Sequence, residues 1–330
     1  MNESSSKYVD QIATEKLLVE KLNRVHHASP LLGDWSLAGF DDFNDLPDLP
    51  QQVQETREGE NILLRFPSAQ VTPFAENNQV VCHIYPAEAP QGELIFVHGL
   101  YEDSLVIYNY FISLLCGLGI QVTLLELPYH YHRTPAASQF SGEYFWSGDL
   151  LRSACAHKQG VYDLFQAYNL RRQSSPGPLG IAGFSMGGGI ALSLAARITL
   201  PCVFLINPVC NLSELVWNSA LFAPIRKDLE AQGIDFTELK ARYQAYEPLD
   251  AAATLTPAKQ ITLARSLYDQ INDPGNYDLL IQHWGLTTVL PYKAGHLNIL
   301  RVPRLASDVV QALLQPEGNV VSDLEQGERE

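Results

Sequence analysis

The segment PLGIAGFSMGGGIALSLAAR, residues 178–197, decides the fold. Its first part is a short apolar run typical of a buried strand, and its last part has the small apolar residues of a packed helix. Between them, residues 183–187 match G-x-S-x-G. Glycines two positions before and after a serine leave room for a sharp strand-to-helix turn that exposes the hydroxyl. The segment therefore predicts a nucleophilic Ser185 and, from Met186 onward, a helix whose first N–H groups point toward a developing oxyanion.

A serine nucleophile needs a general base, and the sequence offers His296 in YKAGHLNIL. This histidine follows a predicted strand and precedes the last predicted helix. His98, His130 and His132 are alternative bases, but all three precede Ser185 along the chain and belong to other loops. We therefore predict that His296 is the base. The G-x-G-x-x-G and G-K-[ST] phosphate-binding motifs do not fit GFSMGGG.

A carboxylate is needed to orient that base, and Asp269 lies just past the end of another predicted strand. The resulting chain order, Ser185, Asp269, His296, is the one expected for a nucleophile on a strand-to-helix turn. Asp273 is an alternative acid, although its place before a proline also suits a turn or a helix cap. We predict Asp269 as the acid and leave Asp273 open.

Short apolar runs alternate with helical patterns through most of the chain, which predicts an α/β fold with a mostly parallel eight-stranded sheet and helices on both faces. The first two strands are expected to pair antiparallel. Strands are expected at residues 62–66, 79–85, 93–98, 120–126, 179–183, 202–206, 260–266 and 287–292. Helices are expected at residues 104–117, 149–170, 186–198 and 300–314 and within 8–26.

Two connections in this pattern are unusually long, compared with the usual length of about 2–6 residues. Residues 208–258 contain helix-like pieces and predict a helical cap insertion, whereas the segment from Leu127 to Gly148 is dense in aromatic residues and histidines. The predicted division of the chain is an N-terminal helix with an acidic connection, a core in two parts, the cap and an acidic tail, at residues 1–60, 61–207 with 259–315, 208–258 and 316–330.

Tyr129, His130 and His132 follow a strand, where ligands of open α/β sheets bind, and are candidates for lining the substrate entrance. A purely local structural role is the alternative for each of them. No third metal ligand accompanies the two histidines at a convincing spacing, so we expect no metal and no cofactor.

Composition excludes several classes of protein. The 330 residues are 46% hydrophobic and 18% charged, which is globular composition, and a net charge of −15 argues against nucleic-acid partners. Five cysteines without C-x-x-C spacing predict buried thiols and neither a disulfide framework nor a zinc finger. No secretory signal or membrane span is recognisable, which predicts a cytoplasmic protein.

Taken together, residues 60–315 resemble the α/β-hydrolase superfamily, through His98-Gly99-Leu100 after a strand, GFSMGG, the late acid and the final Gly-His. The resemblance implies an oxyanion hole made by the backbone N–H groups of Leu100 and Met186. LLELPYHYHRTP before a long helix is also similar to the branch of that superfamily related to hydrolase-domain protein 18.

These observations predict a serine hydrolase that cleaves a carboxylic ester or thioester of a small-molecule acyl substrate through an acyl-enzyme. A peptidase or an acyltransferase with the same triad is the nearest alternative. A catalytically silent α/β-hydrolase that serves as a binding module is another, because a fold does not imply a function. The natural substrate and the oligomeric state are left open.

Overall fold

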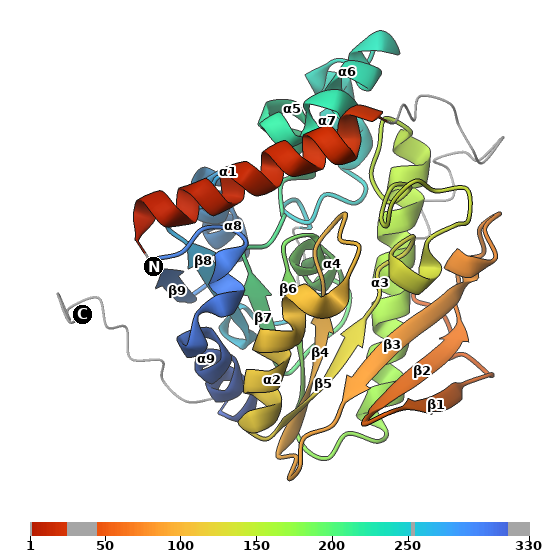
Figure 1. Ribbon diagram of the computed structural model, residues 1–330, viewed down its shortest axis with the longest axis vertical. Coiled ribbons are helices and arrows are strands. Elements are labelled where there is room, and N and C mark those ends of the chain that lie inside the picture. The colour runs from red at the N-terminus through yellow and green to blue at the C-terminus, as the bar shows by residue number, and fades with distance from the viewer. Residues whose placement is uncertain (1, 25–44, 252–254, 316–330) are drawn as a thin grey trace.

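The computed structural model describes residues 2–24, 45–251 and 255–315 (Figure 1). Within them, nine strands form one sheet in the order β1-β2-β3-β5-β4-β6-β7-β8-β9. The strands from β5 to β9 in this order pair in parallel, and β1, β2 and β3 extend the sheet antiparallel. Their bounds are β1 Gln54–Glu58, β2 Asn61–Pro67, β3 Gln79–Tyr85, β4 Gly92–Val97, β5 Ile120–Leu125, β6 Leu179–Phe184, β7 Val203–Ile206, β8 Ile261–Ser266 and β9 Thr288–Tyr292.

Helices cover both faces of this sheet. On one face α2 and α9, which stand beside each other in Figure 1, pack on β4 and β5 through residues such as Phe111 and Val309. On the other face α3, α4 and α8 bury Leu164, Ile190 and Leu280 in a second apolar layer. The helices are α1 Glu3–Glu20, α2 Asn109–Gly117, α3 Leu150–Arg172, α4 Met186–Ala195, α5 Leu212–Asn218, α6 Ala223–Ala231, α7 Phe236–Tyr243, α8 Pro274–Trp284 and α9 Pro303–Leu314.

The predicted α/β architecture is confirmed, with one strand more than expected. All eight predicted strands are present, and the first two of them, β2 and β3, pair antiparallel. The additional strand is β1, which lies within the segment that was read as an acidic connection; all five of its residues, QETRE, are exposed, so it has no apolar alternation to reveal it. The predicted acidic tail, 316–330, lies outside the described residues.

The long connection after β7 forms α5, α6 and α7. These helices lie at the same end of the molecule as α1, which packs against the turn Ala220–Phe222 between α5 and α6. That this insertion covers a substrate remains a prediction.

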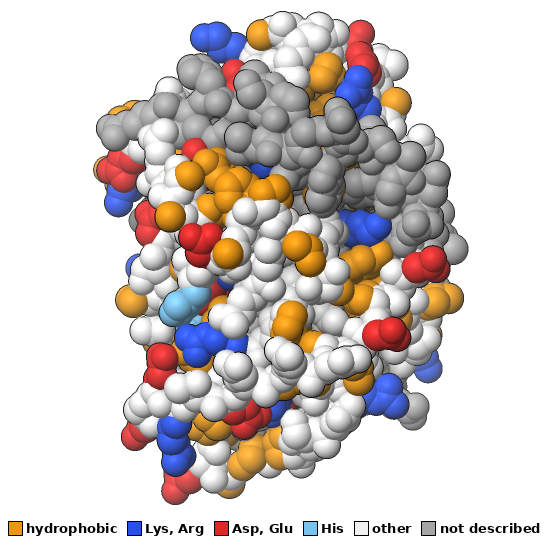
Figure 2. All heavy atoms as spheres, turned by 90° about the vertical axis from the view of Figure 1, so that its right-hand side faces the viewer, with side chains coloured by type: hydrophobic (Ala, Val, Ile, Leu, Met, Phe, Trp, Pro, Cys, Tyr) orange, Lys and Arg blue, Asp and Glu red, His pale blue; other side chains and the backbone are white. Residues whose placement is uncertain are grey.

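None of the helices in the described part of the chain is both long and apolar enough to cross a bilayer. On the face at the antiparallel edge of the sheet, acidic and basic side chains are interspersed (Figure 2).

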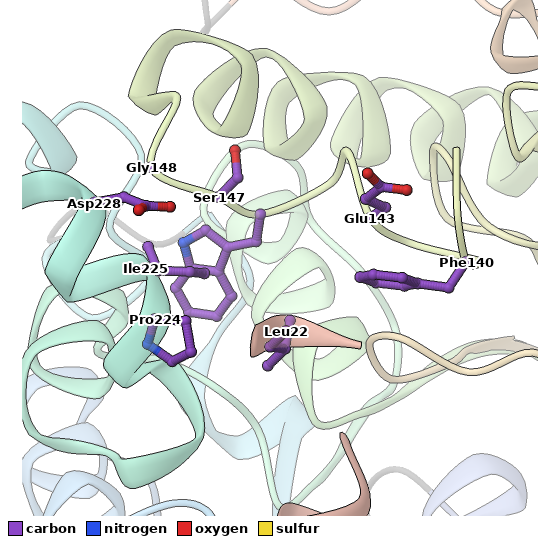
Figure 3. Close-up of a pocket in the computed structure, with 9 residues that line it drawn as sticks. Leu22, Phe140, Glu143, Ser147, Gly148, Pro224, Ile225 and Asp228 are labelled. Atoms are coloured by element: carbon purple, nitrogen blue, oxygen red, sulfur yellow. The ribbon is translucent and has the colours of Figure 1, made fainter. Parts of the chain in front are cut away.

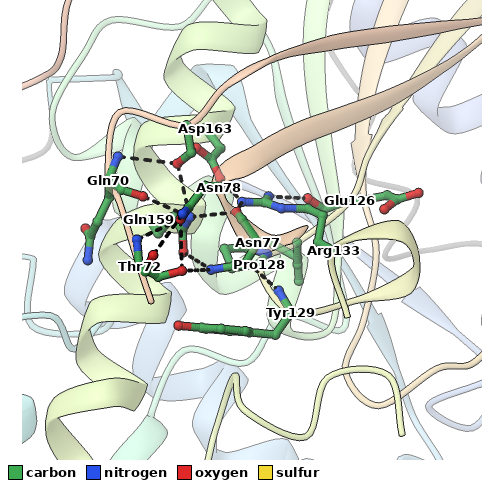
Figure 4. A network of polar contacts seen from close by, with 12 residues as sticks. Gln70, Thr72, Asn77, Asn78, Glu126, Pro128, Tyr129, Arg133, Gln159 and Asp163 are labelled. Atoms are coloured by element: carbon green, nitrogen blue, oxygen red, sulfur yellow. Dashed lines mark hydrogen bonds and ion pairs between the residues drawn. The ribbon is translucent and has the colours of Figure 1, made fainter. Parts of the chain in front are cut away.

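The excursion after β5 is held to the core by a buried polar network around Arg133 (Figure 4). One guanidinium nitrogen donates to the carbonyl of Glu126 at 2.8 Å, and the other contacts Asp163 Oδ2 of α3 at 2.8 Å and the Asn77 carbonyl at 2.9 Å. The backbone N–H of Tyr129 donates to Asn77 Oδ1 at 2.8 Å. The buried ion pair between Arg133 and Asp163 of α3 therefore holds the HYHRTP stretch in place.

Replacing Arg133 by methionine would leave the fully buried Asp163 carboxylate without its cation. We expect a loss of about 3–5 kcal/mol in the free energy of unfolding, because breaking one half of a buried pair strands a charge. Urea denaturation followed by circular dichroism measures this. Arg172→Met, at an exposed position near the end of α3, is the control and should stay within about 0.5 kcal/mol of the parent. A difference below about 1 kcal/mol for Arg133→Met would contradict the assigned role of the ion pair.

Candidate active site

Ser185 stands between β6 and α4 with φ of 53° and ψ of −118°, a conformation that L-residues rarely adopt. Its neighbours in the motif must be glycines because of close backbone approaches. A side-chain carbon on Gly187 would overlap the carbonyl of Val97 in β4, and one on Gly183 would overlap the carbonyl of Gly187. The sharp turn predicted from the sequence is therefore present, and the strained residue is the serine itself.

Ser185 and His296 lie within hydrogen-bond distance, with 2.9 Å between Oγ and Nε2. The other imidazole nitrogen, Nδ1, lies 2.8 Å from Asp269 Oδ2. With the proton on Nδ1, the imidazole donates to the carboxylate and accepts from the serine hydroxyl. The three residues follow β6, β9 and β8, whose carboxyl ends meet at one edge because these strands run parallel. The structure thus brings together the three residues that the sequence singled out as nucleophile, base and acid.

The two candidate acids have different partners. Asp269 is buried and receives the Tyr277 hydroxyl on Oδ2 at 2.7 Å, while its Oδ1 receives the N–H groups of Ile271 and Asn272 at 2.9 Å each. Asp273 instead caps α8, with Oδ1 accepting from the N–H of Gly275 at 2.7 Å. Geometry therefore pairs Asp269, not Asp273, with the imidazole.

Burial and the surrounding acids act in opposite directions on this pair. Burial alone would lower the pKa of His296, but the carboxylates of Asp269, Asp10 and Glu102 outweigh it and raise the pKa above its ordinary value. For Asp269, burial alone would raise the pKa, whereas the imidazolium and the hydrogen bonds that the carboxylate accepts hold the pKa below its ordinary value. Both effects favour a charged Asp269 beside a basic imidazole.

The loop after β4 presents three consecutive backbone N–H groups near the serine turn. Those of Gly99 and Tyr101 are used inside the protein, donating to the Tyr108 hydroxyl at 2.8 Å and to His130 Nε2 at 3.2 Å. Within the described residues, the N–H of Leu100 between them has no hydrogen-bond acceptor. Met186 begins α4, so its N–H has no acceptor within the helix either. Neither of the two N–H groups proposed as oxyanion donors therefore has a hydrogen-bond acceptor in the part of the chain that the structure describes.

His98 holds this loop in place. Its Nε2 accepts the N–H of Leu127 at 2.9 Å, and its Nδ1 donates to the Gly99 carbonyl at 2.6 Å. Burial lowers its pKa well below the ordinary value, so the ring stays neutral and keeps these two roles. These contacts give His98, named from the sequence as an alternative base, a structural role in the loop after β4.

The sequence-based hypothesis was that Tyr129, His130 and His132 line the substrate entrance together. The structure gives the three side chains different surroundings. His130 is fully buried, with Nδ1 on the Pro128 carbonyl at 2.8 Å and Nε2 on the Tyr101 N–H, so the ring has no polar atom left for a substrate. Tyr129 is also buried, with φ of 64°. The side chain of His132 is 50% exposed and contacts Glu126. The alternative local structural role fits His130 best.

His132 belongs to a cluster with His83 and Glu126 whose potential ligand atoms all lie within 4.8 Å of one another. The ring nitrogens of both histidines lie 2.6 and 2.7 Å from the same oxygen, Glu126 Oε1. Two ligands of one zinc ion are about 3.3 Å apart, given metal–ligand bonds of about 2.0–2.2 Å in a tetrahedron. The distances fit two hydrogen bonds to a shared carboxylate better than a shared metal.

Four residues around the site were missed by the sequence analysis. Asp10 and Lys21, at opposite parts of the N-terminal segment, contact the catalytic loops, and Tyr277 contacts Asp269. Glu102 accepts hydrogen bonds from the hydroxyls of Tyr108 and Tyr131, and burial raises its pKa to about 7. No motif marks these residues; for Asp10 and Lys21 the only available signal was a charged residue on the apolar side of a predicted helix, and Glu102 and Tyr277 had none.

Two hollows lie where the end of α1 faces the insertion, and residues 140–148 of the excursion after β5 also line the smaller one. The smaller, of about 10 Å³, is large enough for about one water molecule and is lined by Leu22, Phe140 and Ile225 among others (Figure 3). The larger, of about 370 Å³, lies between Leu18 and Lys227. Neither hollow is lined by a triad residue, and Ser185 is only 9% exposed.

Comparisons with known proteins show the fold. No protein-family model matches the chain. The uncharacterized protein YdjC of Bacillus subtilis (strain 168) is 29% identical over 101 residues, which are 30% of this chain and 86% of that protein. Similar solved structures include an acetyl xylan esterase from Paenibacillus sp. R4, at 14% identity and a TM-score of 0.59, covering 88% of this chain and 99% of that chain.

Acetyl xylan esterase 1 from Thermoanaerobacterium sp. JW/SL YS485 has 15% identity and a TM-score of 0.57, covering 91% of this chain and 99% of that chain. The esterase Pf2001 of Pyrococcus furiosus has 15% identity and a TM-score of 0.52, covering 88% and 99%. These neighbours belong to the α/β-hydrolase superfamily. At such low identities they establish that this chain has the α/β-hydrolase fold.

The raised pKa of His296 can be tested without any substrate. We expect its imidazole to titrate above 6.5, and to titrate at a lower pH in Asp269→Asn, because the largest favourable charge is then gone. Nuclear magnetic resonance of the histidine ring protons, assigned with His296→Gln, follows the titration. An imidazole that titrates below 6.5 in the parent protein would show that burial outweighs the carboxylates.

Proposed function

We propose that this protein is a serine hydrolase that cleaves a carboxylic ester or thioester through an acyl-enzyme. The observation that carries the proposal is the continuous set of contacts from Ser185 to His296 to Asp269, at 2.9 and 2.8 Å. This is the arrangement in which an imidazole can remove the serine proton while a buried carboxylate stabilises the imidazolium that forms. The fold shared with esterases supports it.

In the proposed reaction, Ser185 Oγ bonds to the acyl carbon while its proton passes to His296 Nε2. The carbonyl oxygen becomes an oxyanion, to which the N–H groups of Leu100 and Met186 donate. Collapse of this intermediate breaks the bond to the alcohol or thiol, which takes the proton from the imidazole. A water molecule then gives a proton to His296 and attacks the acyl group, which releases the carboxylic acid and restores the serine.

The choice of substrate rests on the segments around the serine. The insertion at 208–258 and the excursion at 127–148 are rich in Leu, Phe, Tyr and Trp, which favours an uncharged, apolar acyl or alcohol group. The same triad would serve a peptidase or an acyltransferase, and these stay the alternatives. A cytoplasmic location is also proposed; it is supported by five free cysteines, of which four are buried. The narrower likeness to the branch of hydrolase-domain protein 18 stays a prediction.

A series of p-nitrophenyl esters of increasing acyl length tests the activity. We expect turnover by the parent protein and a loss of at least about 10³-fold in kcat for Ser185→Ala and for His296→Ala, because each removes a member of one catalytic unit. The acyl length with the highest kcat/KM would begin to define the pocket. Equal turnover by the parent and Ser185→Ala would exclude the proposed nucleophile.

The acid is tested by a matched pair of variants. Asp269→Asn should lower kcat by about 10³–10⁴-fold, because the imidazole loses the carboxylate that fixes its tautomer. Asp273→Asn should leave kcat within about threefold of the parent, because asparagine caps a helix as well as aspartate does. The reverse ranking of the two variants would assign the role to Asp273.

A further inference from the structure

We propose that the N-terminal helix α1 positions the catalytic loops, with Asp10 holding the loops of His296 and Asp269 and Lys21 holding the oxyanion loop. The inference rests on the proposed function, because it concerns the geometry of that triad. It assigns a role in catalysis to a helix that lies outside the α/β core.

Asp10 is fully buried and its carboxylate receives three backbone N–H groups. Its Oδ2 accepts from the N–H of His296 itself at 2.6 Å and from Gln270 at 3.2 Å, and its Oδ1 accepts from Leu297 at 3.1 Å. Gln270 is the residue after Asp269. One carboxylate therefore joins the loop of the base to the loop of the acid, which fixes the separation of the two side chains.

A second contact one turn earlier secures the same loop. The Asn298 side-chain amide donates to the buried hydroxyl of Ser6 at 3.1 Å, and its oxygen accepts the N–H of Gly295 at 2.6 Å. There is no room for a side chain at Gly295, since a carbon there would meet Asp10 Oδ2 at 2.7 Å. The histidine loop is thus packed directly on α1, and its residue before His296 must be glycine for that reason.

Lys21, which caps the other end of α1, reaches the opposite side of the site. Its ammonium group donates to the Tyr101 carbonyl at 2.6 Å and pairs with Asp103 at 2.6 Å, and its side chain is only 10% exposed. Tyr101 directly follows Leu100, whose N–H is a proposed oxyanion donor. The helix accordingly spans from the base to the oxyanion loop and fixes them relative to each other.

Asp10 also acts on the chemistry through its charge. The carboxyl groups with the largest effects on His296 are Asp269 from the loop after β8, Asp10 from α1 and Glu102 from the loop after β4, and each raises its pKa when charged. Burial raises the pKa of Asp10 itself, whereas the backbone hydrogen bonds of His296 and Leu297 and the charge of His296 favour the carboxylate. Removing one of these charges should therefore lower the pKa of the base. The base must be neutral to accept the serine proton, so the acidic limb of the pH profile of kcat/KM should then move to lower pH. Replacing a side chain that only filled space would not move this limb.

The test compares Asp10→Asn with the exposed control Glu15→Gln on the same helix, using the preferred p-nitrophenyl ester. We expect Asp10→Asn to fold, to lose about 10–100-fold in kcat with KM within about threefold, and to shift the acidic limb to lower pH, because small displacements of reacting groups are costly. Glu15→Gln should match the parent protein. An Asp10→Asn protein with the parent's kcat and the parent's acidic limb would overturn the proposal.

Lys21→Met provides an independent arm, with the exposed Lys16→Met as its control. We expect a loss of about 10-fold or more in kcat for Lys21→Met alone. If circular dichroism shows that Asp10→Asn does not fold, this arm decides, and equal kcat for the two lysine variants would overturn the proposal. Absence of turnover by the parent protein would instead refute the proposed function, which separates the two failures.

Discussion

The close approach of three backbone segments around Ser185 is the constraint on which the site depends. The start of α4 lies so near the end of β4 that Gly187 has no room for a side chain, and this holds Ser185 in its strained conformation. The same contact brings the loop after β4, which carries Leu100, close to the first turn of α4, which begins at Met186. Packing of bare backbone, more than any side-chain interaction, thus sets the position of the nucleophile and of the proposed oxyanion donors.

The remaining parts of the site are aligned by the register of the parallel strands. Asn207 at the end of β7 shows how this works: its side-chain nitrogen donates to the His296 carbonyl at 3.0 Å and to Ser266 Oγ at 2.9 Å, while its oxygen accepts the Ser266 N–H at 2.8 Å. One asparagine therefore ties the end of β8 to the loop after β9. Short loops after these strands are then enough to bring the three triad residues together. From outside the sheet, Asp10 of α1 holds the His296 loop through the backbone N–H of His296.

The features of the molecule that could be predicted from the sequence are those with local patterns. Buried parallel strands are continuous apolar runs, and the serine turn has a motif whose glycines follow from sterics, so Ser185, His296 and Asp269 could be named in advance. β1 and Asp10 could not be predicted, because an exposed edge strand has no apolar alternation and a clamp 286 residues from its partner has no local spacing. The sequence left two roles open for His130 for a related reason: a histidine in a loop looks the same whether it faces a ligand or, as here, two backbone groups.

Labelling with a fluorophosphonate, followed by intact-mass measurement and peptide mapping, is the sharpest test of Ser185 as the nucleophile, because the reagent reacts with a serine that a base and oxyanion donors activate. We expect a single adduct on the parent protein, located on the peptide that contains Ser185 and absent from the folded Ser185→Ala variant. A folded parent protein that forms no adduct, or one that carries the adduct on another residue, would contradict the assignment of this site.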